Sequence, residues 1–358
     1  MNSPDSKTRL GRVLWDFGYF VRIGVPFSPS NHFVDQRRPD IIDVDVLGIR
    51  FDVDFTPQFA VGQVTVGTDK VLDSVLRLGG LMRALKARTG FLITDRETQT
   101  YRNVAKPLGI SILSDRQLQG LETKATFPKK LFGSFDPFLA SKVADFKQDV
   151  RRKFRSQLNY LIYRYWVEPY YSQIKRLISI AKTLRPYDGS TPFQWMIGET
   201  MIRFVVSLCH LCNELYLVPE EELKAEVSTQ LFGGVIQRRE REELRATIAN
   251  LISQLSQPGQ KRLHPEDELS LDPEYIPALT EVAWRVTNQS RITRQLPRFA
   301  DLMWYEFVLK DKPVSEAGMA DFFSEREFSI LSKILRDIIE FLTRTAGMDA
   351  RLFETMFA

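Results

Sequence analysis

Two aspartates stand at alternate positions in the most strongly β-forming stretch of the chain. Residues 41–51 read IIDVDVLGIRF, which places Asp43 and Asp45 two residues apart. Side chains at positions i and i+2 of a strand point to the same face, so the two carboxylates can share one site. Carboxylate oxygens are ligands that Mg²⁺ prefers, and a bound metal ion can activate water for phosphate-ester hydrolysis. The alternative is that both aspartates are solvated acids of an edge strand and form no site.

A basic segment in the middle of the chain is the second candidate for a functional region. Residues 147–185 hold ten lysines and arginines and two acids, a charge of about +8 (10 − 2), although the whole chain carries only +4. Aromatic residues are interleaved with these cations, and cations suit phosphates while aromatic rings can stack on bases. Lys147, Arg151 and Arg155 are four residues apart, which predicts that they share one face of a helix. The predicted nucleic-acid-binding residues are Lys147, Arg151, Arg152, Lys153, Arg155, Arg164, Lys175 and Arg176, with Arg12, Arg22, Arg37 and Arg38 extending the same surface.

The same segment has a plainer interpretation. Phe146, Val150, Phe154, Leu158 and Leu161 form an apolar stripe of the predicted helix, which indicates a core-facing side. The cations then belong to the solvated side of an amphipathic helix, or they contact an acidic protein.

A third candidate is the sequence Cys209-His210-Leu211-Cys212, which is half of a zinc site. A structural zinc needs four ligands, and the only other histidines in the chain are His32 and His264. The two cysteines also lie in the apolar helical run 202–217. We therefore predict buried free cysteines and no metal.

The composition is that of an ordinary globular chain. Hydrophobic residues make up 44% of the 358 residues and charged residues 26%. Two cysteines cannot build a disulfide framework, the N-terminus lacks the apolar core of a signal peptide, and no apolar run reaches the roughly 18 residues that span a bilayer. We expect a cytoplasmic protein that does not enter a membrane. No phosphate-binding loop, dinucleotide fingerprint or hydrolase elbow is present in the sequence.

Hydrophobic periodicity predicts how these candidates are positioned. The first part reads as helix, three strands, helix, strand, helix and strand, at residues 8–22, 21–27, 41–51, 59–66, 69–88, 91–94, 98–108 and 110–113. The first three strands are expected to form a meander, and the later alternation predicts parallel crossovers.

After about residue 125 the pattern is helical. The predicted helices span 138–166, 168–184, 192–216, 219–230, 235–256, 274–289, 298–310 and 325–346, and the last begins with a capping box and ends before Gly347. We predict a domain at 1–124, a helical domain at 125–256 that carries the basic segment, a polar, proline-containing linker at 257–273, and a C-terminal helical subdomain at 274–358.

The run from Gly11 to Thr94 resembles the PD-(D/E)XK nuclease family, about a third of the chain being covered. The resemblance rests on a helix, the strand with Asp43-Val44-Asp45, a following strand that ends in a glycine turn at Gly67, and then a helix and a strand. It implies a restriction-endonuclease-like mixed-sheet α/β domain followed by an all-α region. Asp45 fits the metal-binding aspartate of the family, with Asp43 on the same face. Gln63 then stands where active members have an acid, and Thr65 stands where they have the lysine.

The resemblance with its two replaced positions implies a catalytically degenerate nuclease-like subunit. We expect it to bind DNA or to organise a nucleoprotein complex in prokaryotic anti-phage defence or DNA processing, with a protein partner such as an NTPase or an active nuclease. No cofactor is expected. One alternative is an active nuclease in which Mg²⁺ is bound at Asp45 and Gln63 and a displaced lysine, Lys70, restores activity. The other alternative is a pure protein-interaction scaffold.

Overall fold

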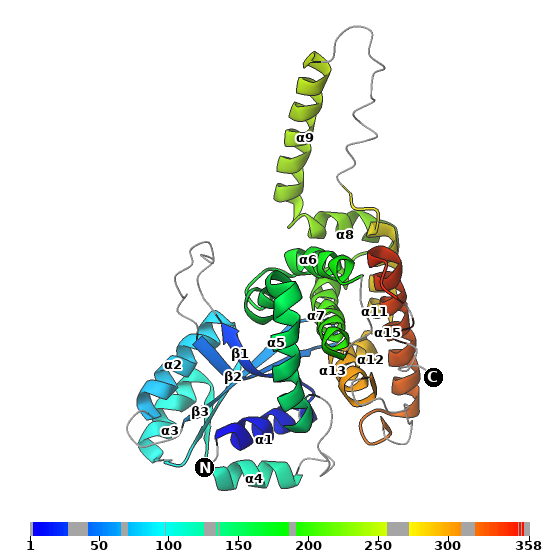
Figure 1. Cartoon of the computed structure of the whole chain (residues 1–358). Coiled ribbons are helices and arrows are strands. Elements are labelled where there is room, and N and C mark those ends of the chain that lie inside the picture. Colours follow the sequence, from blue (N-terminus) through cyan, green and yellow to red (C-terminus); the bar gives the residue numbers. More distant parts are fainter. Residues whose placement is uncertain are drawn as a thin grey trace.

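The structure is a computed structural model that describes residues 3–27, 42–65, 71–96, 98–124, 134, 137–185, 191–255, 272–308, 319–349, 351 and 353. A sheet with its flanking helices forms one side of the molecule and a helical region forms the other, while helix α9 projects away from the body (Figure 1). The five-stranded mixed sheet followed by a mostly helical region confirms the predicted α+β class.

The N-terminal region has the predicted order of elements up to the fifth strand, and one further helix, which was not predicted, follows that strand. The elements are α1 (Ser3–Asp16), β1 (Phe20–Phe27), β2 (Ile42–Phe51), β3 (Pro57–Thr65), α2 (Val71–Ala84), β4 (Thr89–Thr94), α3 (Gln99–Ala105), β5 (Ile110–Leu113) and α4 (Asp115–Lys124). The strands lie side by side in sequence order. The strands β1, β2 and β3 form an antiparallel meander, and β3, β4 and β5 are parallel, as the alternating helices predict.

The first helix ends earlier than its apolar pattern predicts. It stops at Asp16, and Gly18 has a φ of 91°, a left-handed conformation that favours glycine and turns the chain into β1. Phe20 therefore belongs to the edge strand and not to the helix. Its side chain is buried between the sheet and the helical region.

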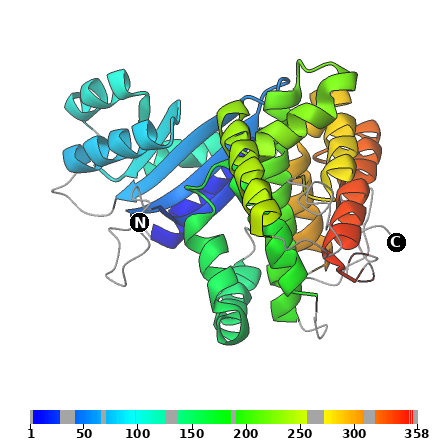
Figure 2. The same cartoon turned by 90° about the horizontal axis from the view of Figure 1, so that it is seen from above.

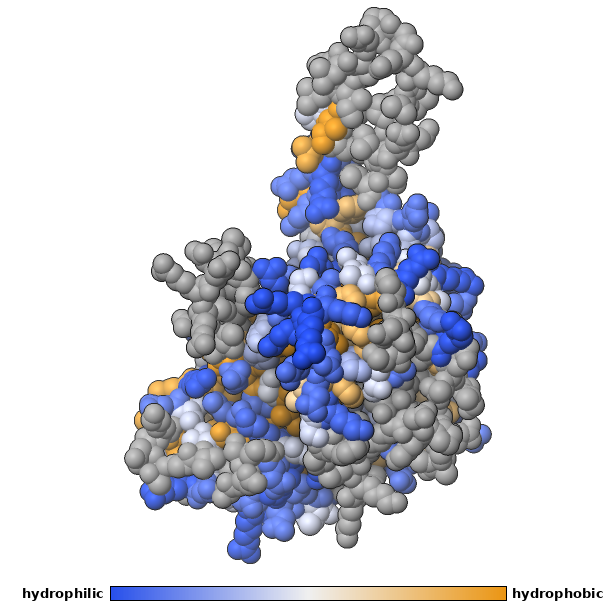
Figure 3. Space-filling view, viewed as in Figure 1, coloured by the Kyte–Doolittle hydropathy of each residue, from blue (hydrophilic) through white to orange (hydrophobic). Residues whose placement is uncertain are grey.

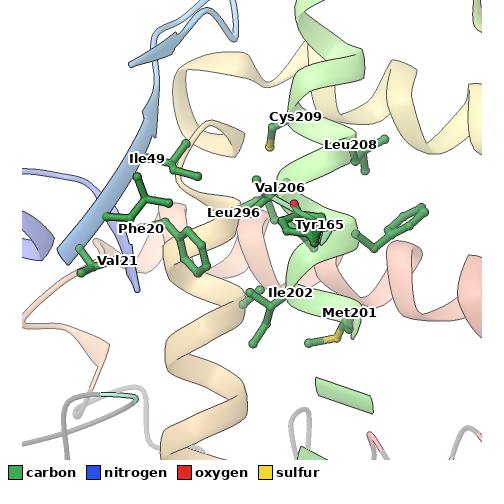
Figure 4. Close-up of a cluster of buried hydrophobic side chains, with 14 of the residues drawn as sticks. Phe20, Val21, Ile49, Tyr165, Met201, Ile202, Val206, Leu208, Cys209 and Leu296 are labelled. Atoms are coloured by element: carbon green, nitrogen blue, oxygen red, sulfur yellow. The ribbon is translucent and has the colours of Figure 1, made fainter. Parts of the chain in front are cut away.

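Helix α1 packs closely on one face of the sheet. A Cβ atom at Gly62 would overlap the side chain of Leu10, and one at Gly48 would crowd the ring of Tyr19. The opposite face meets the helical region, where Phe20 and Ile49 face Ile202 and Val206 of a long helix (Figure 4). Apolar residues of both regions form one continuous buried cluster.

The helical region surrounds that long helix. Its elements are α5 (Pro137–Asn159), the π-helical turn η3 (Tyr160–Arg164), α6 (Tyr170–Thr183), α7 (Thr191–Leu215), α8 (Leu223–Leu231), α9 (Val235–Leu255), α11 (Ile276–Asn288), α12 (Ser290–Thr293), α13 (Leu296–Leu302), the π-helical turn η5 (Met303–Val308) and α15 (Glu325–Ala346). The view from above shows α7 between the sheet side and the outer helices (Figure 2). Helix α7 is long and apolar enough to cross a membrane, but 94% of its most apolar window is buried within the protein. It is therefore the central core helix.

The ends of α15 follow the predicted signals. Ser324 Oγ accepts the Glu327 N–H, and the Glu327 side chain accepts the Ser324 N–H, which is a complete capping box. Gly347 ends the helix at a φ of 69°. The predicted linker at 257–273 lies outside the described residues, apart from its last two positions.

The packing around Gly198 of α7 can be tested against Gly80, a glycine of helix α2 that has open space around it. A Cβ at Gly198 would overlap the indole ring of Trp304, whereas a Cβ at Gly80 on α2 would meet nothing within 4 Å. Gly198→Ala is expected to lower the free energy of unfolding by about 1–3 kcal/mol because a packed core has no room for the added methyl group. Gly80→Ala should raise it by up to about 1 kcal/mol because alanine is the better helix former. Chemical denaturation of both variants checks the opposite signs, and a destabilising effect of equal size in both would contradict this packing.

Helix α7 also carries the cysteines and the histidine of the half zinc site. Cys209 and Cys212 are buried and free, as predicted, and burial raises the pKa of both thiols. The His210 ring packs edge-on against Phe51 and stacks on Phe59, which joins α7 to the sheet. Within the described part of the chain, no cluster of three or more histidine, cysteine or acidic side chains is arranged to hold a metal.

The half-buried His210 predicts a specific acid sensitivity. Burial lowers its pKa from 6.5 to about 4, so between these values the unfolded chain takes up a proton that the folded chain does not. The stability that this histidine preserves above pH 6.5 is lost as the pH falls towards 4. We expect the free energy of unfolding of the wild type, measured against that of His210→Gln, to fall by on the order of 2 kcal/mol across this window. Parallel pH profiles of the two proteins would contradict the assignment.

Candidate functional site

Asp45 lies where two strands of the sheet diverge. The pairing of β2 with β3 reaches Val46 and Gly62, and Asp45 comes directly before the first of these residues. One carboxylate oxygen, Oδ2, accepts the Val64 N–H at 2.7 Å. The other, Oδ1, is 2.6 Å from Nζ of Lys7 on α1, and the aspartate side chain is only 12% exposed. The negative charge of Asp45 is therefore balanced by an ammonium group of the protein itself.

Gln63 and Thr65, the other two positions implied by the resemblance, lie on β3 close to the point where β2 and β3 diverge. We call this point the fork. Continuing the β2–β3 register by one residue places Gln63 opposite Asp45, so their side chains share one face. Oε1 of Gln63 is buried and has no hydrogen-bond partner among the described residues. The Thr65 hydroxyl donates to Oγ of Ser74 on α2 at 2.9 Å. Thr65 is thus tied to the helix that follows its strand.

The remaining sequence-predicted residues of this site are not brought to the fork. Asp43 is exposed and lies opposite Pro26 in the β1–β2 register. Lys70 lies outside the described residues. The amine that does reach Asp45 comes from Lys7, at the start of the chain. No local spacing signals this contact, because the helix and the strand meet only through packing of α1 on the sheet.

The chemistry open to this group of residues is limited. A Mg²⁺ ion at Asp45 would have to displace the Lys7 ammonium and would find one carboxylate and one amide oxygen there. A site with a single charged oxygen ligand attracts the ion weakly, because hard cations depend on carboxylate charge. The described geometry therefore favours an ion pair over a metal centre at Asp45.

The basic segment divides into two groups of side chains. Six of its predicted nucleic-acid-binding residues are exposed, namely Arg151, Arg152, Lys153, Arg155, Arg164 and Arg176. Lys147 and Lys175 are half-buried. Nζ of Lys175 donates to the Leu231 carbonyl at 2.8 Å, and Nζ of Lys147 lies 5.9 Å from the centre of the Trp195 ring. These two lysines serve the interior of the helical region more than its surface.

A kink changes the predicted helical face. Phe154 has the non-helical angles φ −127° and ψ 43°, so α5 changes direction between Arg151 and Arg155. The predicted alignment of Lys147, Arg151 and Arg155 along one straight face is therefore interrupted. Hydrophilic residues still gather over α5 and α6 on the face seen in Figure 3.

Two of the aromatic residues of the segment pack inside the protein, and the others are half-buried. Tyr160 and Tyr165 are buried, and burial raises the pKa of both phenols. The Tyr165 hydroxyl donates to the Arg203 carbonyl at 2.9 Å. Their alternation with cations thus follows from an amphipathic helix, and the exposed arginines are the part of the segment that remains available to a phosphate backbone.

Sequence reasoning placed Arg22 on the nucleic-acid-binding surface, and the structure places it in a buried charge network. Its guanidinium donates to Oδ1 of Asp301 at 2.6 Å and to Oε1 of Glu199 at 2.9 Å. Glu199 also pairs with Arg203, and it accepts the Tyr305 hydroxyl at 2.8 Å. Of the other predicted extensions, Arg12 is half-buried, and Arg37 and Arg38 lie outside the described residues.

The pKa values within this network follow from burial and charge pairing. Burial alone would raise the pKa of Glu199, but Arg203 and Arg22 hold it at about 2. Burial raises the pKa of Asp301, and Arg22 only partly offsets that effect. Asp301 therefore depends on Arg22 for its ion pair, whereas Glu199 is paired with both arginines. The network joins β1 of the sheet to α7 and α13 of the helical region.

Comparisons of the chain with known proteins add no further argument. No protein-family model matches it, and neither the search of curated proteins nor the search of solved structures finds a significant match. The function of the chain is therefore inferred from its own residues.

Proposed function

We propose that this chain is a nuclease-like subunit that does not cleave nucleic acid and that binds DNA through the exposed arginines of α5. The observation that carries the first half is the state of Asp45, which is bound by Lys7 and by the Val64 N–H. Gln63 and Thr65 stand at the positions where the resemblance expects an acid and a lysine. One carboxylate, already paired with an ammonium group, supports a site that does not cleave.

The fold supports a restriction-endonuclease-like origin for the N-terminal region. The strand with the aspartates (β2), the strand with Gln63 (β3) and β4 are neighbours in the sheet, and helix α2 connects β3 to β4, which is the order on which the resemblance rests. Asp45 and Gln63 lie opposite each other when the β2–β3 register is continued by one residue. These are the features expected of a nuclease-like domain whose catalytic positions have been replaced.

The second half of the proposal rests on the surface of α5. Arg151, Arg152 and Arg155 are exposed, and guanidinium groups form paired hydrogen bonds with phosphate oxygens. Contacts of this kind bind the DNA backbone without reading its sequence. Such a subunit would position DNA in the cytoplasm for a separate enzyme, such as an NTPase or an active nuclease. Anti-phage defence or DNA processing in a prokaryote is the setting that the family resemblance suggests.

A second candidate function is an active nuclease, and one observation favours it. Lys7 brings an amine to within 2.6 Å of Asp45, and Oε1 of Gln63 is buried beside them without a partner among the described residues. The Asp45 carboxylate and the Gln63 amide oxygen would bind the metal ion, and the Lys7 ammonium would supply the amine of the family's site. Lys7 would then have the role that the sequence analysis gave to Lys70.

A cleavage assay separates the two candidates. The full chain with Mg²⁺ or Mn²⁺ is expected to leave plasmid DNA, single-stranded DNA and RNA intact, because the fork holds only one carboxylate and its charge is already neutralised. Products are resolved on denaturing gels. Cleavage that disappears in both Asp45→Ala and Lys7→Ala, and that persists in the exposed control Asp73→Ala, would establish the second candidate. Cleavage that survives Asp45→Ala would come from a contaminating nuclease.

A further inference from the structure

A cavity of about 520 Å³ lies where the edge strand β1 meets the helical region. Residues 21–26 of β1 line one side, and residues of α5, α7 and η5 line the others. This volume lies in the range of sites that hold small organic ligands. The cavity is separate from the exposed face of α5, since Arg151, Arg152 and Arg155 are not among its lining residues.

The lining of the cavity is strongly cationic. Four basic side chains contribute to it, namely Lys7, Arg22, Lys147 and Arg203, against the single acid Glu199, which leaves a formal charge of +3 (4 − 1). Glu199 is already paired with both arginines. Outside the lining, Asp301 also pairs with Arg22 and Asp45 pairs with Lys7, so Lys147 is the lining cation that has no direct ion pair among the described residues. An anion is the ligand that this lining favours.

Two of the lining cations are fixed in place by buried ion pairs. The side chains of Arg22 and Arg203 are only 10% and 7% exposed. The Nε atom of each is buried, with no hydrogen-bond partner in the part of the chain that the structure describes. Both guanidinium groups are held by carboxylates, so the two arginines are fixed positive groups in the cavity wall, while their Nε atoms are closed off from the cavity.

Lys147 is held in this environment at an energetic cost. Burial lowers its pKa, and the positive charges of Arg203 and Arg22 lower it further, against the effect of Glu199. An anion beside its ammonium would offset both effects. Lys7 also lines the cavity while its Nζ binds Asp45, so one side chain links the cavity to the fork of the sheet.

Aromatic rings form another part of the wall. Trp195 donates from Nε1 to the Tyr305 hydroxyl at 3.1 Å, which fixes both rings. Trp166 lies beside them, with the Arg203 guanidinium 5.3 Å from its ring centre. Rigid aromatic surfaces next to cations suit a planar ring that carries phosphate.

We propose that this cavity binds a phosphorylated small molecule of nucleotide size. Its phosphate oxygens accept hydrogen bonds from Lys147 and Lys7 beside the fixed charges of the two arginines, and its planar base packs against the tryptophans. Phosphate fits better than a carboxylate because it offers more acceptor oxygens and charge to this number of donors. The inference is independent of DNA binding, which uses exposed arginines outside the cavity.

Calorimetric titration of the full chain with ADP tests the proposal, with adenosine, inorganic phosphate and citrate as comparison ligands. We expect saturable binding of one ADP per chain, binding of adenosine and of citrate at least tenfold weaker, and a higher melting temperature in the presence of ADP. Lys147→Gln should weaken ADP binding at least tenfold. The control Lys142→Gln, on the same helix and outside the cavity lining, should bind ADP as the wild type does.

Trp166→Leu provides a second variant that leaves the buried ion pairs intact, and it should also weaken ADP at least tenfold. Melting of each variant without ligand shows whether it is folded. The proposal is overturned if ADP shows no saturable binding at millimolar concentration, or if folded Lys147→Gln and Trp166→Leu bind it as the wild type does. It is also overturned if citrate or adenosine binds as tightly as ADP, or if inorganic phosphate binds and ADP does not.

Discussion

Replacing Arg22 with leucine is expected to destabilise the protein by about 3–5 kcal/mol, because the change leaves two buried carboxylates without their shared cation. Asp301 and Glu199 side chains are 2% and 5% exposed, so both charges lie largely out of bulk water. Arg203 still compensates Glu199, but no other described ion pair holds Asp301. The loss should appear as a lower midpoint in chemical denaturation. Because the network joins the sheet to the helical region, both regions should unfold in one transition.

Two further variants make this expectation specific. Arg22→Leu combined with Asp301→Asn should recover part of the lost stability, since the second change removes the uncompensated charge. Arg239→Ala, which breaks an exposed ion pair with Glu243, should cost less than about 1 kcal/mol. An Arg22→Leu variant as stable as Arg239→Ala would show that the network does not contribute to folding as described.

Reversing the exposed charges of α5 is expected to weaken DNA binding by orders of magnitude. Arg151, Arg152 and Arg155 are all exposed, and changing them to glutamate leaves the buried Val150 of the same helix untouched. Each phosphate contact releases a counterion from the DNA when the protein binds, and a lost contact no longer does so. The slope of log affinity against log salt for duplex DNA should therefore fall by roughly three. Helix content should not change, because arginine and glutamate have similar helix propensities.

The control for this reversal is an equal change of charge elsewhere. Arg326, Lys333 and Arg344 are exposed on α15, which lies on the other side of the helical region from α5 (Figure 2). Changing these three residues to glutamate alters the net charge of the protein equally. Fluorescence anisotropy with labelled duplex DNA should show near wild-type affinity for the α15 variant. Equal losses in the two variants would mean that net charge, and not the surface of α5, governs binding. Loss of a co-purified protein partner in the α5 variant alone, with DNA binding unchanged, would favour the scaffold alternative.

The sequence allowed the order of elements to be predicted because that order depends on local patterns. Alternating apolar residues in 41–51 and the capping box at Ser324 each act within a few residues, and both features appear in the structure. The buried state of Cys209 and Cys212 followed from the apolar run around them. The end of the first helix was predicted wrongly from the local pattern. The apolar stripe of 8–22 continues past Gly18, but the backbone turns there into β1.

The contacts at the candidate sites depend on residues that are far apart in the chain. Arg22 lies 177 residues from Glu199 and 279 from Asp301, and neither partner could be assigned by spacing. An arginine in an edge strand is typical of an exposed surface, and only the docking of the helical region buries it. Lys7 reaches Asp45 through the packing of α1 on the sheet. Lys147 has the spacing of a surface cation, but its position on α5 directs it to the cavity.

The central claim, a nuclease-like subunit that binds DNA without cutting it, is tested most directly by one measurement on the intact protein. Labelled duplex DNA is titrated with the full chain in Mg²⁺ buffer at several salt concentrations, and the same samples are then run on a denaturing gel. We expect saturable binding that weakens steeply with salt, and DNA that stays intact. Absence of binding at low salt would contradict the DNA-binding half of the claim. Cleavage that Asp45→Ala abolishes would contradict the other half.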